Sequence, residues 1–361
     1  MRGSTSTHTS RPGSRATRAV LASAAVIVAA TGIGVSAGAT TVPEGGGEYM
    51  VEPKDGPYTV GLANGFVGNS WRAQMVAELE YAVSQRDDID ELLVTNANND
   101  VSAQNSQISD LVASGVDLLL VDAVSETALN AELERAHDAG VLVVSFDGTA
   151  STPAGIRVNT DQAEFGTIGA EWLVEAMGGS GSVIALHGVA GNPTSDSRWE
   201  AAKAVLDEAG IDIVGEANAD WDLAQGRAAA ADLLAANPDI TGIYSQGGAM
   251  SLGALQALEA AGRDPLPVPG EGLNQFLKKW AELNESSGWT SVAPSQPPSI
   301  VVRALEVGIA ALGGEDPGQE VNIPLPVIDQ DNLADSVRPD QPDSLWLPTD
   351  LPDDVIAELL S

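Results

Sequence analysis

Short apolar runs alternate with longer amphipathic segments from residue 58 onward. The apolar runs hold three to six residues, as expected of strands that are buried on both faces. The longer segments carry apolar side chains three or four positions apart, which is the spacing of one helix face. Strands are predicted at 58–63, 92–95, 116–121 and 141–146, and helices at 71–86, 102–114 and 125–139. This order predicts βαβ units built on a parallel sheet.

The same alternation restarts after residue 161. It predicts strands at 183–186, 212–214 and 240–244, and helices at 163–177, 196–209, 223–236 and 249–261. Eight βα units could also close into one barrel. A short spacer at 157–161 and a proline-rich stretch at 294–298 are instead typical of crossings between lobes. The expected fold is therefore α/β, with two similar doubly wound parallel-sheet lobes and a ligand cleft between them.

The first 39 residues have the three parts of a secretory signal. Four arginines lie within residues 1–18, residues 19–35 are apolar or small, and Ala37-Gly38-Ala39 has small residues at the cleavage positions. An uncleaved anchor helix is the alternative, because the apolar run is close to the shortest length that spans a membrane. Both alternatives place the folded part outside the cytoplasm, in the periplasm, on the outer face of the membrane or secreted.

The rest of the chain divides into a linker, two lobes and a tail. The tail is acidic and rich in proline, and it is expected to pack along a lobe edge because Trp346, Leu347 and Leu351 need cover; a solvated tail is the alternative. The expected ranges are signal peptide 1–39, flexible linker 40–57, N-terminal lobe 58–160 and 296–326, C-terminal lobe 161–295 and 327–334, and tail 335–361.

Composition excludes several classes of function. The 361 residues include 51 acidic and 17 basic side chains, a formal net charge of −34, so no nucleic-acid partner is expected. There is no cysteine, which excludes disulfides, thiolate catalysis and cysteine-ligated metals. Only His137 and His187 follow the predicted signal, so no metal site and no cofactor are expected. His187 is interpreted as a hydrogen-bonded structural residue.

Known catalytic motifs are absent from the sequence, so the chain is not expected to be an enzyme. Glycoside hydrolysis by Asp147 and Glu271 is a less favoured alternative that rests only on the abundance of acids.

Polar and aromatic residues follow nearly every predicted strand, where parallel sheets bind ligands. Carboxylates and amides can engage neighbouring hydroxyls, and flat aromatic rings can cover the apolar face of a sugar. Each residue also has a simpler explanation: an asparagine or aspartate can cap the next helix, Trp71 can belong to the core, and arginines can form surface ion pairs. The candidate ligand-binding residues are Asn69, Trp71, Arg72, Asn96, Asp122, Asp147, Arg198, Trp221, Gln246, Glu271 and Gln296.

The chain resembles the periplasmic type I solute-binding proteins, in particular the ribose/galactose-type sugar-binding proteins of ABC importers. The resemblance covers about residues 58–331 and rests on the order and spacing of segments 58–62, 68–72, 115–121, 143–147, 188–191, 238–246 and 251–255. It implies a protein that binds a sugar or polyol between its lobes and delivers it to a membrane permease. We expect a monomer. An extracytoplasmic sensing module that signals to a receptor is the alternative.

Matched to the family's pattern, Asn69, Trp71, Asp147 and Trp221 resemble ligand-contacting positions. Arg72 occupies the place of a second aromatic residue. The sequence departs from the pattern elsewhere: Gly148 stands where arginine is frequent, Asp196 lies nearest the position of a cleft arginine, Gly247 replaces an asparagine, and Glu271 replaces an aspartate. The resemblance therefore predicts a binding pocket that differs from a standard ribose site.

Overall fold

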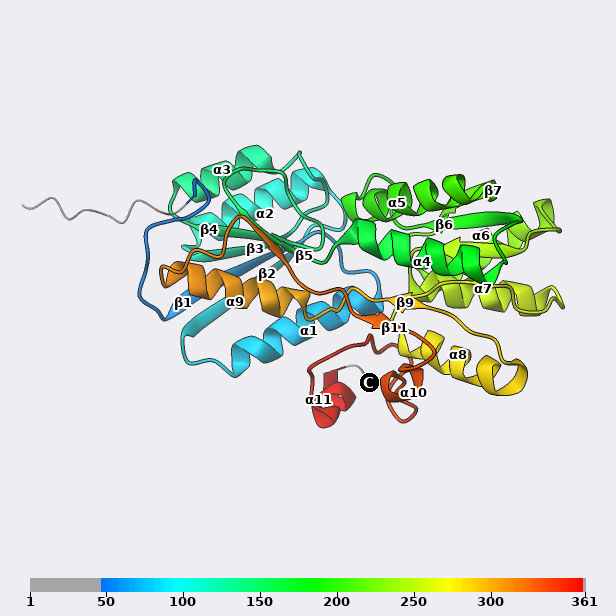
Figure 1. Cartoon of the computed structure of the whole chain (residues 1–361). Helices are drawn as coiled ribbons and strands as arrows, with labels where there is room; N and C mark the ends of the chain where they lie inside the picture. Colours follow the sequence, from blue (N-terminus) through cyan, green and yellow to red (C-terminus); the bar gives the residue numbers. More distant parts are fainter. Residues whose placement is uncertain (1–46, 360–361) are drawn as a thin grey trace, which may run out of the picture. The chain divides into compact units, whose positions relative to one another are not determined.

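Two parallel β-sheets organise the chain, and helices pack on both faces of each sheet (Figure 1). The structure is a computed structural model that describes residues 47–359. The predicted signal peptide and the first residues of the predicted linker lie outside this range. The described residues confirm the α/β fold with parallel sheets.

The first sheet has six strands in the order β10-β5-β4-β3-β1-β2. Its central strands are buried on both faces, which explains their unbroken apolar sequences. Its strands are β1 (Tyr58–Asn64), β2 (Ile89–Asn96), β3 (Leu118–Asp122), β4 (Leu142–Phe146), β5 (Ile156–Asn159) and β10 (Glu320–Asn322). The helices packed on it are α1 (Ser70–Ser84), α2 (Val101–Ala113), α3 (Asn130–Asp138) and α9 (Ile300–Leu312). We call this group of elements the first lobe.

The second lobe contains a three-stranded sheet in the order β7-β6-β8. Its strands are β6 (Ser182–His187), β7 (Asp212–Asn218) and β8 (Gly242–Ser245). Its helices are α4 (Gln162–Ala176), α5 (Pro193–Ala209), α6 (Leu223–Ala236), α7 (Gly248–Ala260) and α8 (Asn274–Ser287). The helix predicted at 223–236 forms with the same bounds, as α6. The strand predicted at 212–214 is longer than expected, because β7 extends to Asn218.

The chain passes between the lobes three times, near residues 160–161, 295–299 and 323–326. Two very short strands, β9 (Ala293–Pro294) and β11 (Val327–Ile328), pair antiparallel beside the second and third passages. Most of the predicted spacer 157–161 is in fact β5, and α8 and α9 are absent from the prediction. The lobe boundaries given above remain a prediction.

Asparagine and aspartate side chains cap several helices that follow strands. Each cap accepts a hydrogen bond from a backbone N–H in the first turn and stabilises the helix by about 1 kcal/mol. The capped helices therefore begin at positions fixed by the sequence just after each strand. The capping residues are Asn69 of α1, Asp100 of α2, Asp161 of α4, Asn192 of α5 and Asp222 of α6.

Residues 47–57, the described part of the predicted linker, are attached to the first lobe. The Tyr49 hydroxyl donates to Asp316 at 2.7 Å, and the Lys54 backbone N–H donates to the Leu312 carbonyl at 2.9 Å. The Lys54 ammonium also pairs with Asp117 at 3.0 Å. These contacts therefore hold residues 47–57 against the first lobe.

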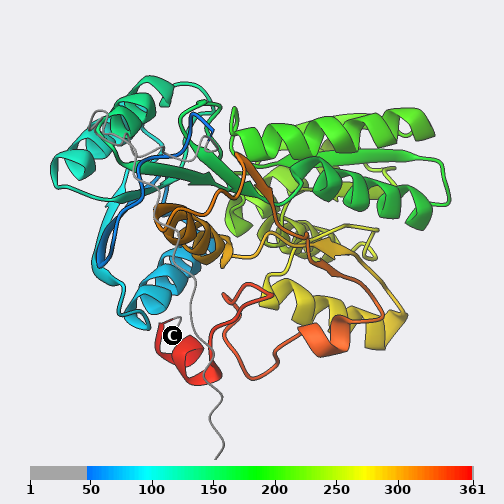
Figure 2. The ribbon, with the colours of Figure 1, turned by 60° about the vertical axis from the view of Figure 1, so that its left-hand side comes forward.

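The C-terminal part packs on both lobes, as Figure 2 shows for the segment between α1 and α8. It contains two short helices, α10 (Leu333–Ser336) and α11 (Asp353–Leu359). Leu345, Trp346 and Leu347 between them are buried. The apolar residues of the tail are therefore covered, as expected, and the solvated alternative is wrong for this stretch.

Candidate functional site

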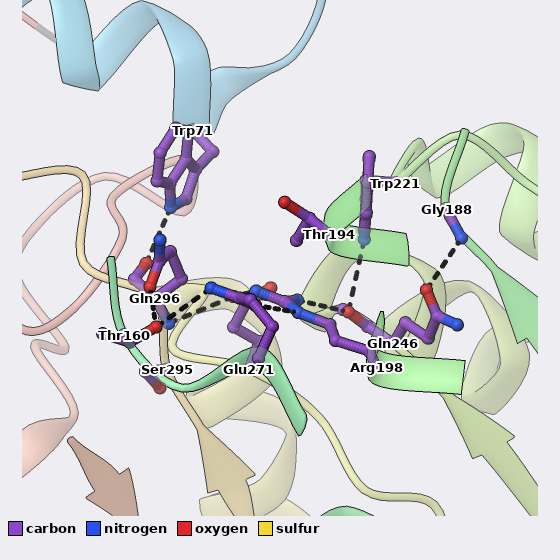
Figure 3. Close-up of polar contacts among 12 residues, drawn as sticks. Trp71, Thr160, Gly188, Thr194, Arg198, Trp221, Gln246, Glu271, Ser295 and Gln296 are labelled. Carbon is purple, nitrogen blue, oxygen red and sulfur yellow. Dashed lines mark hydrogen bonds and ion pairs between the residues drawn. The ribbon is translucent and has the colours of Figure 1, made fainter. Parts of the chain in front are cut away.

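The carboxyl ends of the parallel strands surround one pocket. In the first sheet Asn64 is level with Asn96 on one side and with Asp122 on the other, so three strands end at the same height. The space between the residues that line the pocket, together with the solvent open to it, is about 390 Å³. Eight of the eleven candidate residues line it, and Thr194 and Trp346 complete it. Figure 3 shows part of this lining, with Trp71, Gln296 and Glu271 near Thr194, Arg198 and Trp221. The lining consists of Asn69, Trp71, Arg72, Asp147, Thr194, Arg198, Trp221, Glu271, Gln296 and Trp346.

On the first lobe, Arg72 sits between two carboxylates. Its guanidinium forms an ion pair with Asp147 at 2.7 Å and a second ion pair with Asp122. The guanidinium carbon also lies 5.0 Å from the centre of the Trp71 ring. Burial lowers the pKa of Arg72, and the attraction of Asp147 opposes that shift. Asp122 is thus a partner of Arg72 behind the pocket wall and does not line the pocket, and its direct contact with a ligand stays a prediction.

Two pocket residues have an unusual backbone conformation. Asp147 has a φ of +53° and Trp221 a φ of +52°, in the left-handed region that bulky residues rarely adopt. Such conformations cost on the order of 1–3 kcal/mol and persist where the surrounding structure holds them. The Trp221 ring packs closely on Gly188, where an added Cβ would lie 2.2 Å from the ring. Both residues line the pocket, and the surrounding structure must hold them in this conformation.

On the second lobe, Arg198 of α5 has mostly neutral partners. Its Nε donates to the Gln162 side chain at 2.8 Å, and its Nη1 donates to the Gln246 carbonyl at 2.9 Å. Its nearest carboxylate oxygen, on Glu271, is 3.4 Å away. The guanidinium carbon lies 3.5 Å from the centre of the Phe165 ring. Amides and an aromatic ring thus hold this arginine at the pocket.

Glu271 is buried, and burial raises its pKa to about 7. The attraction of Arg198 and a hydrogen bond from the Gln296 backbone N–H lower the pKa, and the charge of Asp147 raises it. The hydrogen bonds that its Oε1 accepts are long, at 3.2 Å from the Gln296 N–H and at 3.4 Å and 3.5 Å from Arg198. Glu271 can therefore accept a further hydrogen bond from a polar ligand.

Gln296 lies on a passage between the lobes and contacts both sides of the pocket. Its Nε2 donates to Asp147 at 3.2 Å, and its carbonyl accepts a hydrogen bond from the Trp71 indole at 2.8 Å. The Thr160 hydroxyl, on another passage, donates to its amide oxygen. From α5, the Thr194 hydroxyl donates to the Asp147 carbonyl at 3.3 Å, which joins the lobes directly.

Gln246 supports the pocket from behind. Its side-chain oxygen accepts hydrogen bonds from the Gly188 N–H at 3.2 Å and the Ser195 hydroxyl at 2.9 Å, and its carbonyl accepts one from Trp221 at 3.3 Å. His187 lies 3.3 Å from its amide nitrogen, in line with a structural role. The side chain of Gln246 makes its hydrogen bonds inside the second lobe. It does not line the pocket, although the sequence makes it a candidate.

Asn96 also lies outside the pocket. It ends β2, which is the outermost strand of its sheet, and β1 separates it from β3 and β4. Its side-chain amide donates to the Asn98 side chain at 2.9 Å, within the turn that leads to α2. The sequence shows that a polar residue follows this predicted strand, but it does not show that the strand lies at the edge of the sheet.

Two lining residues, Thr194 and Trp346, are missing from the candidate list. Thr194 lies between the Asn192 cap and the helix predicted at 196–209, where one hydroxyl has no distinctive pattern. Trp346 lies in the tail, and the only signal in the sequence is an apolar residue that needs cover in an acidic segment.

A second, polar hollow adjoins the pocket, and together with the solvent open to it the space measures about 820 Å³. Asp147 and Thr194 line both spaces. Glu126 and Asp161 add acidic groups to the second hollow. A ligand group that extends past Asp147 would therefore meet polar side chains. Among residues 47–359, no group of three or more histidine or acidic residues is placed to hold a metal ion.

Comparison with known proteins identifies the family. The profile described as "Periplasmic binding protein domain" matches residues 60–316. The chain belongs to this family. It is 27% identical to the ribose import binding protein RbsB of Bacillus subtilis over 74% of this chain and 86% of that protein. It is 28% identical to a xylitol-binding protein of Mycolicibacterium smegmatis over 67% of this chain and 70% of that protein.

A solved structure agrees with this assignment. The chain is similar to an ABC transporter solute binding protein from Thermobispora bispora, with a TM-score of 0.73, 27% identity and coverage of 83% of this chain and 94% of that one. The resemblance to ribose/galactose-type sugar-binding proteins, inferred from the sequence, is therefore confirmed for this periplasmic binding protein.

Proposed function

We propose that this protein is the substrate-binding component of an ABC transporter and binds one sugar or sugar-like polyol in the pocket. The observation that carries the proposal is the pocket itself, in which carboxylates, amides and tryptophan rings converge between two lobes. The relatives named for ribose and xylitol support the same ligand class.

The chemistry of the lining suits hydroxylated ligands. Asp147, Glu271 and Asn69 offer oxygen atoms that accept hydrogen bonds from hydroxyls, and the two arginines donate hydrogen bonds. The rings of Trp71 and Trp221 provide flat surfaces for the apolar face of a sugar ring.

Binding by lobe closure is the mechanism that the connections support. Three passages of chain join the lobes, and the contact from Thr194 to Asp147 crosses between them. We propose that the lobes close over the ligand by a hinge motion at these passages and release it unchanged. The named relatives are binding proteins, which supports binding without turnover.

The partner and location follow from the family. We propose that the loaded protein, as a monomer, docks on a membrane permease outside the cytoplasm, and that residues 1–39 direct its export. Within residues 47–359, none of the helices combines the length and apolar character needed to cross a bilayer.

A ligand panel tests this function. The purified protein is heated with pentoses, hexoses, pentitols and inositols, and its melting temperature is recorded. A specific ligand at one hundred times its Kd should stabilise the protein by about 2.7 kcal/mol. Asp147→Asn should weaken binding about 10- to 100-fold, because a hydrogen bond to a charged group is lost. A panel that produces no shift would overturn the sugar-class proposal.

Delivery and sensing are separated by a second measurement. The loaded protein is used to capture membrane proteins from its own cells. Capture of a permease supports delivery. Capture of a receptor kinase in its place would favour the sensing alternative.

A further inference from the structure

A third tryptophan reaches the pocket from beyond the part of the chain that matches the family. Trp346 lines the same space as Trp71 and Trp221, whereas the family match ends at residue 316. It belongs to residues 337–351, which we call the C-terminal strap. The side chain is buried, with 3% of its surface exposed. The strap therefore adds a wall that the two lobes do not supply.

One side of the strap is bonded to a single face of α1. Ser70, Gln74 and Glu78 are spaced four residues apart and so share that face. Gln74 makes two hydrogen bonds to the backbone of Trp346. The Gln74 side-chain oxygen accepts from the Trp346 N–H at 2.7 Å, and the Gln74 Nε2 donates to the Trp346 carbonyl at 2.9 Å. The Trp346 indole N–H donates to Ser70 at 2.8 Å, and Thr349 donates to Glu78 at 2.8 Å.

The other side of the strap is bonded to the start of α8 in the second lobe. The Leu347 N–H donates to the Gly272 carbonyl at 2.7 Å, and the Asn274 N–H donates to the Leu345 carbonyl at 2.7 Å. A Cβ at Gly272 would lie 1.9 Å from the Leu347 carbonyl oxygen, so this close approach needs glycine. Trp346 is thus held by side chains of α1 on one side and by the backbone at 272–274 on the other.

These two supports also carry the pocket. The first turn of α1 holds Trp71 and Arg72, and Glu271 directly precedes Gly272. Figure 2 shows the strap between α1 and α8. The position of the Trp346 ring is therefore tied to residues on both sides of the ligand space.

We propose that Trp346 is a ligand-contacting residue that limits the size of the sugar or polyol this pocket accepts; this inference rests on the proposed function. Its indole N–H is occupied by Ser70, so the ring offers the ligand carbon atoms only. A compact ligand gains an apolar wall for its C–H groups. A bulkier ligand collides with a ring that both supports hold in place.

Calorimetric titration of matched variants tests the proposal. Trp346→Ala is compared with Trp289→Ala, which removes another buried tryptophan whose indole donates to the Leu266 carbonyl at 3.0 Å but which does not line the pocket. Trp346→Phe gives a milder change at the same place if the alanine variant fails to fold. The ligands are the compact sugar or polyol that the wild-type protein binds best and a disaccharide or alkyl glycoside derived from it.

The decisive quantity is the ratio of the two affinities, since a general loss of stability would not change it. In Trp346→Ala the compact ligand should bind at least tenfold more weakly, and the ratio should move at least tenfold toward the bulky ligand. Trp346→Phe should move the ratio in the same direction by less. Trp289→Ala should leave the ratio unchanged.

Two results would overturn the inference, and they differ. If the wild-type protein binds ligands of the panel but the ratio stays the same in both Trp346 variants, the role of Trp346 is structural and the proposed function stands. If the wild-type protein binds no sugar or polyol, the proposed function is wrong and this inference is wrong with it.

Discussion

Arg72 and Arg198 face the same pocket from different lobes, and their partners differ in charge. Arg72 pairs with the carboxylates of Asp122 and Asp147, so this side of the pocket carries more negative than positive charge. Arg198 is held by two glutamine oxygens and one aromatic ring, and its nearest carboxylate oxygen is 3.4 Å away. One lobe fixes its arginine mainly with ion pairs, whereas the other fixes it mainly with neutral groups.

This difference assigns different tasks to the two sides. A buried charge without a partner costs several kcal/mol, so the Arg72 cluster must stay intact for the first lobe to be stable. Glu271 beside Arg198 has a pKa of about 7 and can become neutral where its partner is lost. The first lobe thus contributes an ion-pair cluster around Arg72, and the second lobe contributes Glu271, whose charge depends on pH.

The largest expected effect comes from removing Arg72. Arg72→Met leaves two buried carboxylates side by side without a counter-charge and should lower the free energy of unfolding by about 3–5 kcal/mol. Arg198→Met is the matched variant on the other side. It should cost about 1–3 kcal/mol, since it leaves neutral hydrogen-bonding groups unpaired and Glu271 can bind a proton.

Chemical denaturation of the two variants and the wild-type protein measures both effects. The contrast between the two arginines is wrong if Arg198→Met lowers the free energy of unfolding as much as Arg72→Met does, or more.

A medium effect is expected from pH. Burial raises the pKa of Glu271 to about 7, and burial likewise raises that of Glu78, under the C-terminal strap, to about 7. The usual value for glutamate is near 4.5. Between pH 4.5 and pH 7 the folded protein therefore binds protons that the unfolded chain has lost, and its stability falls as pH rises. Below pH 4.5 this contribution is fully present, and above pH 7 it is gone.

Glutamine variants separate the two groups. Glu271→Gln and Glu78→Gln should each remove part of the pH slope, on the order of 1–3 kcal/mol between pH 4.5 and 8. Only Glu271→Gln should also change the pH dependence of ligand affinity, because Glu78 does not line the pocket. Thermal unfolding across this pH range, without ligand, measures the slopes. A slope that both variants leave unchanged would contradict the assignment.

Local patterns in the sequence predict the fold well where an element buries its side chains within one lobe. The run Val116 to Val121 and the helical spacing from 223 to 236 depend only on burial and repeat length, and both elements form. The four residues of β5 alternate between apolar and polar, but a run this short does not distinguish a strand from a spacer, and its pairing with β4 and β10 fixes it. Elements held by distant partners are therefore the ones that pattern alone does not reveal.

The pocket follows the same rule. Asp147 and Trp221 are predictable as candidates because each follows a strand, and strand ends of a parallel sheet meet at one edge. Asn96 and Asp122 satisfy the same criterion but lie at the sheet edge or behind Arg72. Trp346 follows no strand and reaches the pocket through contacts with α1 and α8. Strand order and long-range docking decide these cases, and neither can be read from local spacing.

The smallest effect concerns the two asparagines that begin the arginine-bearing helices. Asn69 caps α1, which carries Arg72, and Asn192 caps α5, which carries Arg198. Asn69→Ala and Asn192→Ala should each lower the free energy of unfolding by about 1 kcal/mol, because each removes one helix cap. Only Asn69 also lines the pocket. Ligand affinity should therefore fall further in Asn69→Ala than in Asn192→Ala.

Asn96→Ala serves as the control, since Asn96 lies at the end of a strand but outside the pocket. The ligand affinity of this variant should match that of the wild-type protein within about twofold. Denaturation and titration of the three variants give both quantities. Equal losses of affinity in Asn69→Ala and Asn192→Ala would mean that helix placement, and not contact with the ligand, explains the effect. In that case the two sides of the pocket would depend on their caps to the same extent, and the contrast between them would rest on the arginine partners alone.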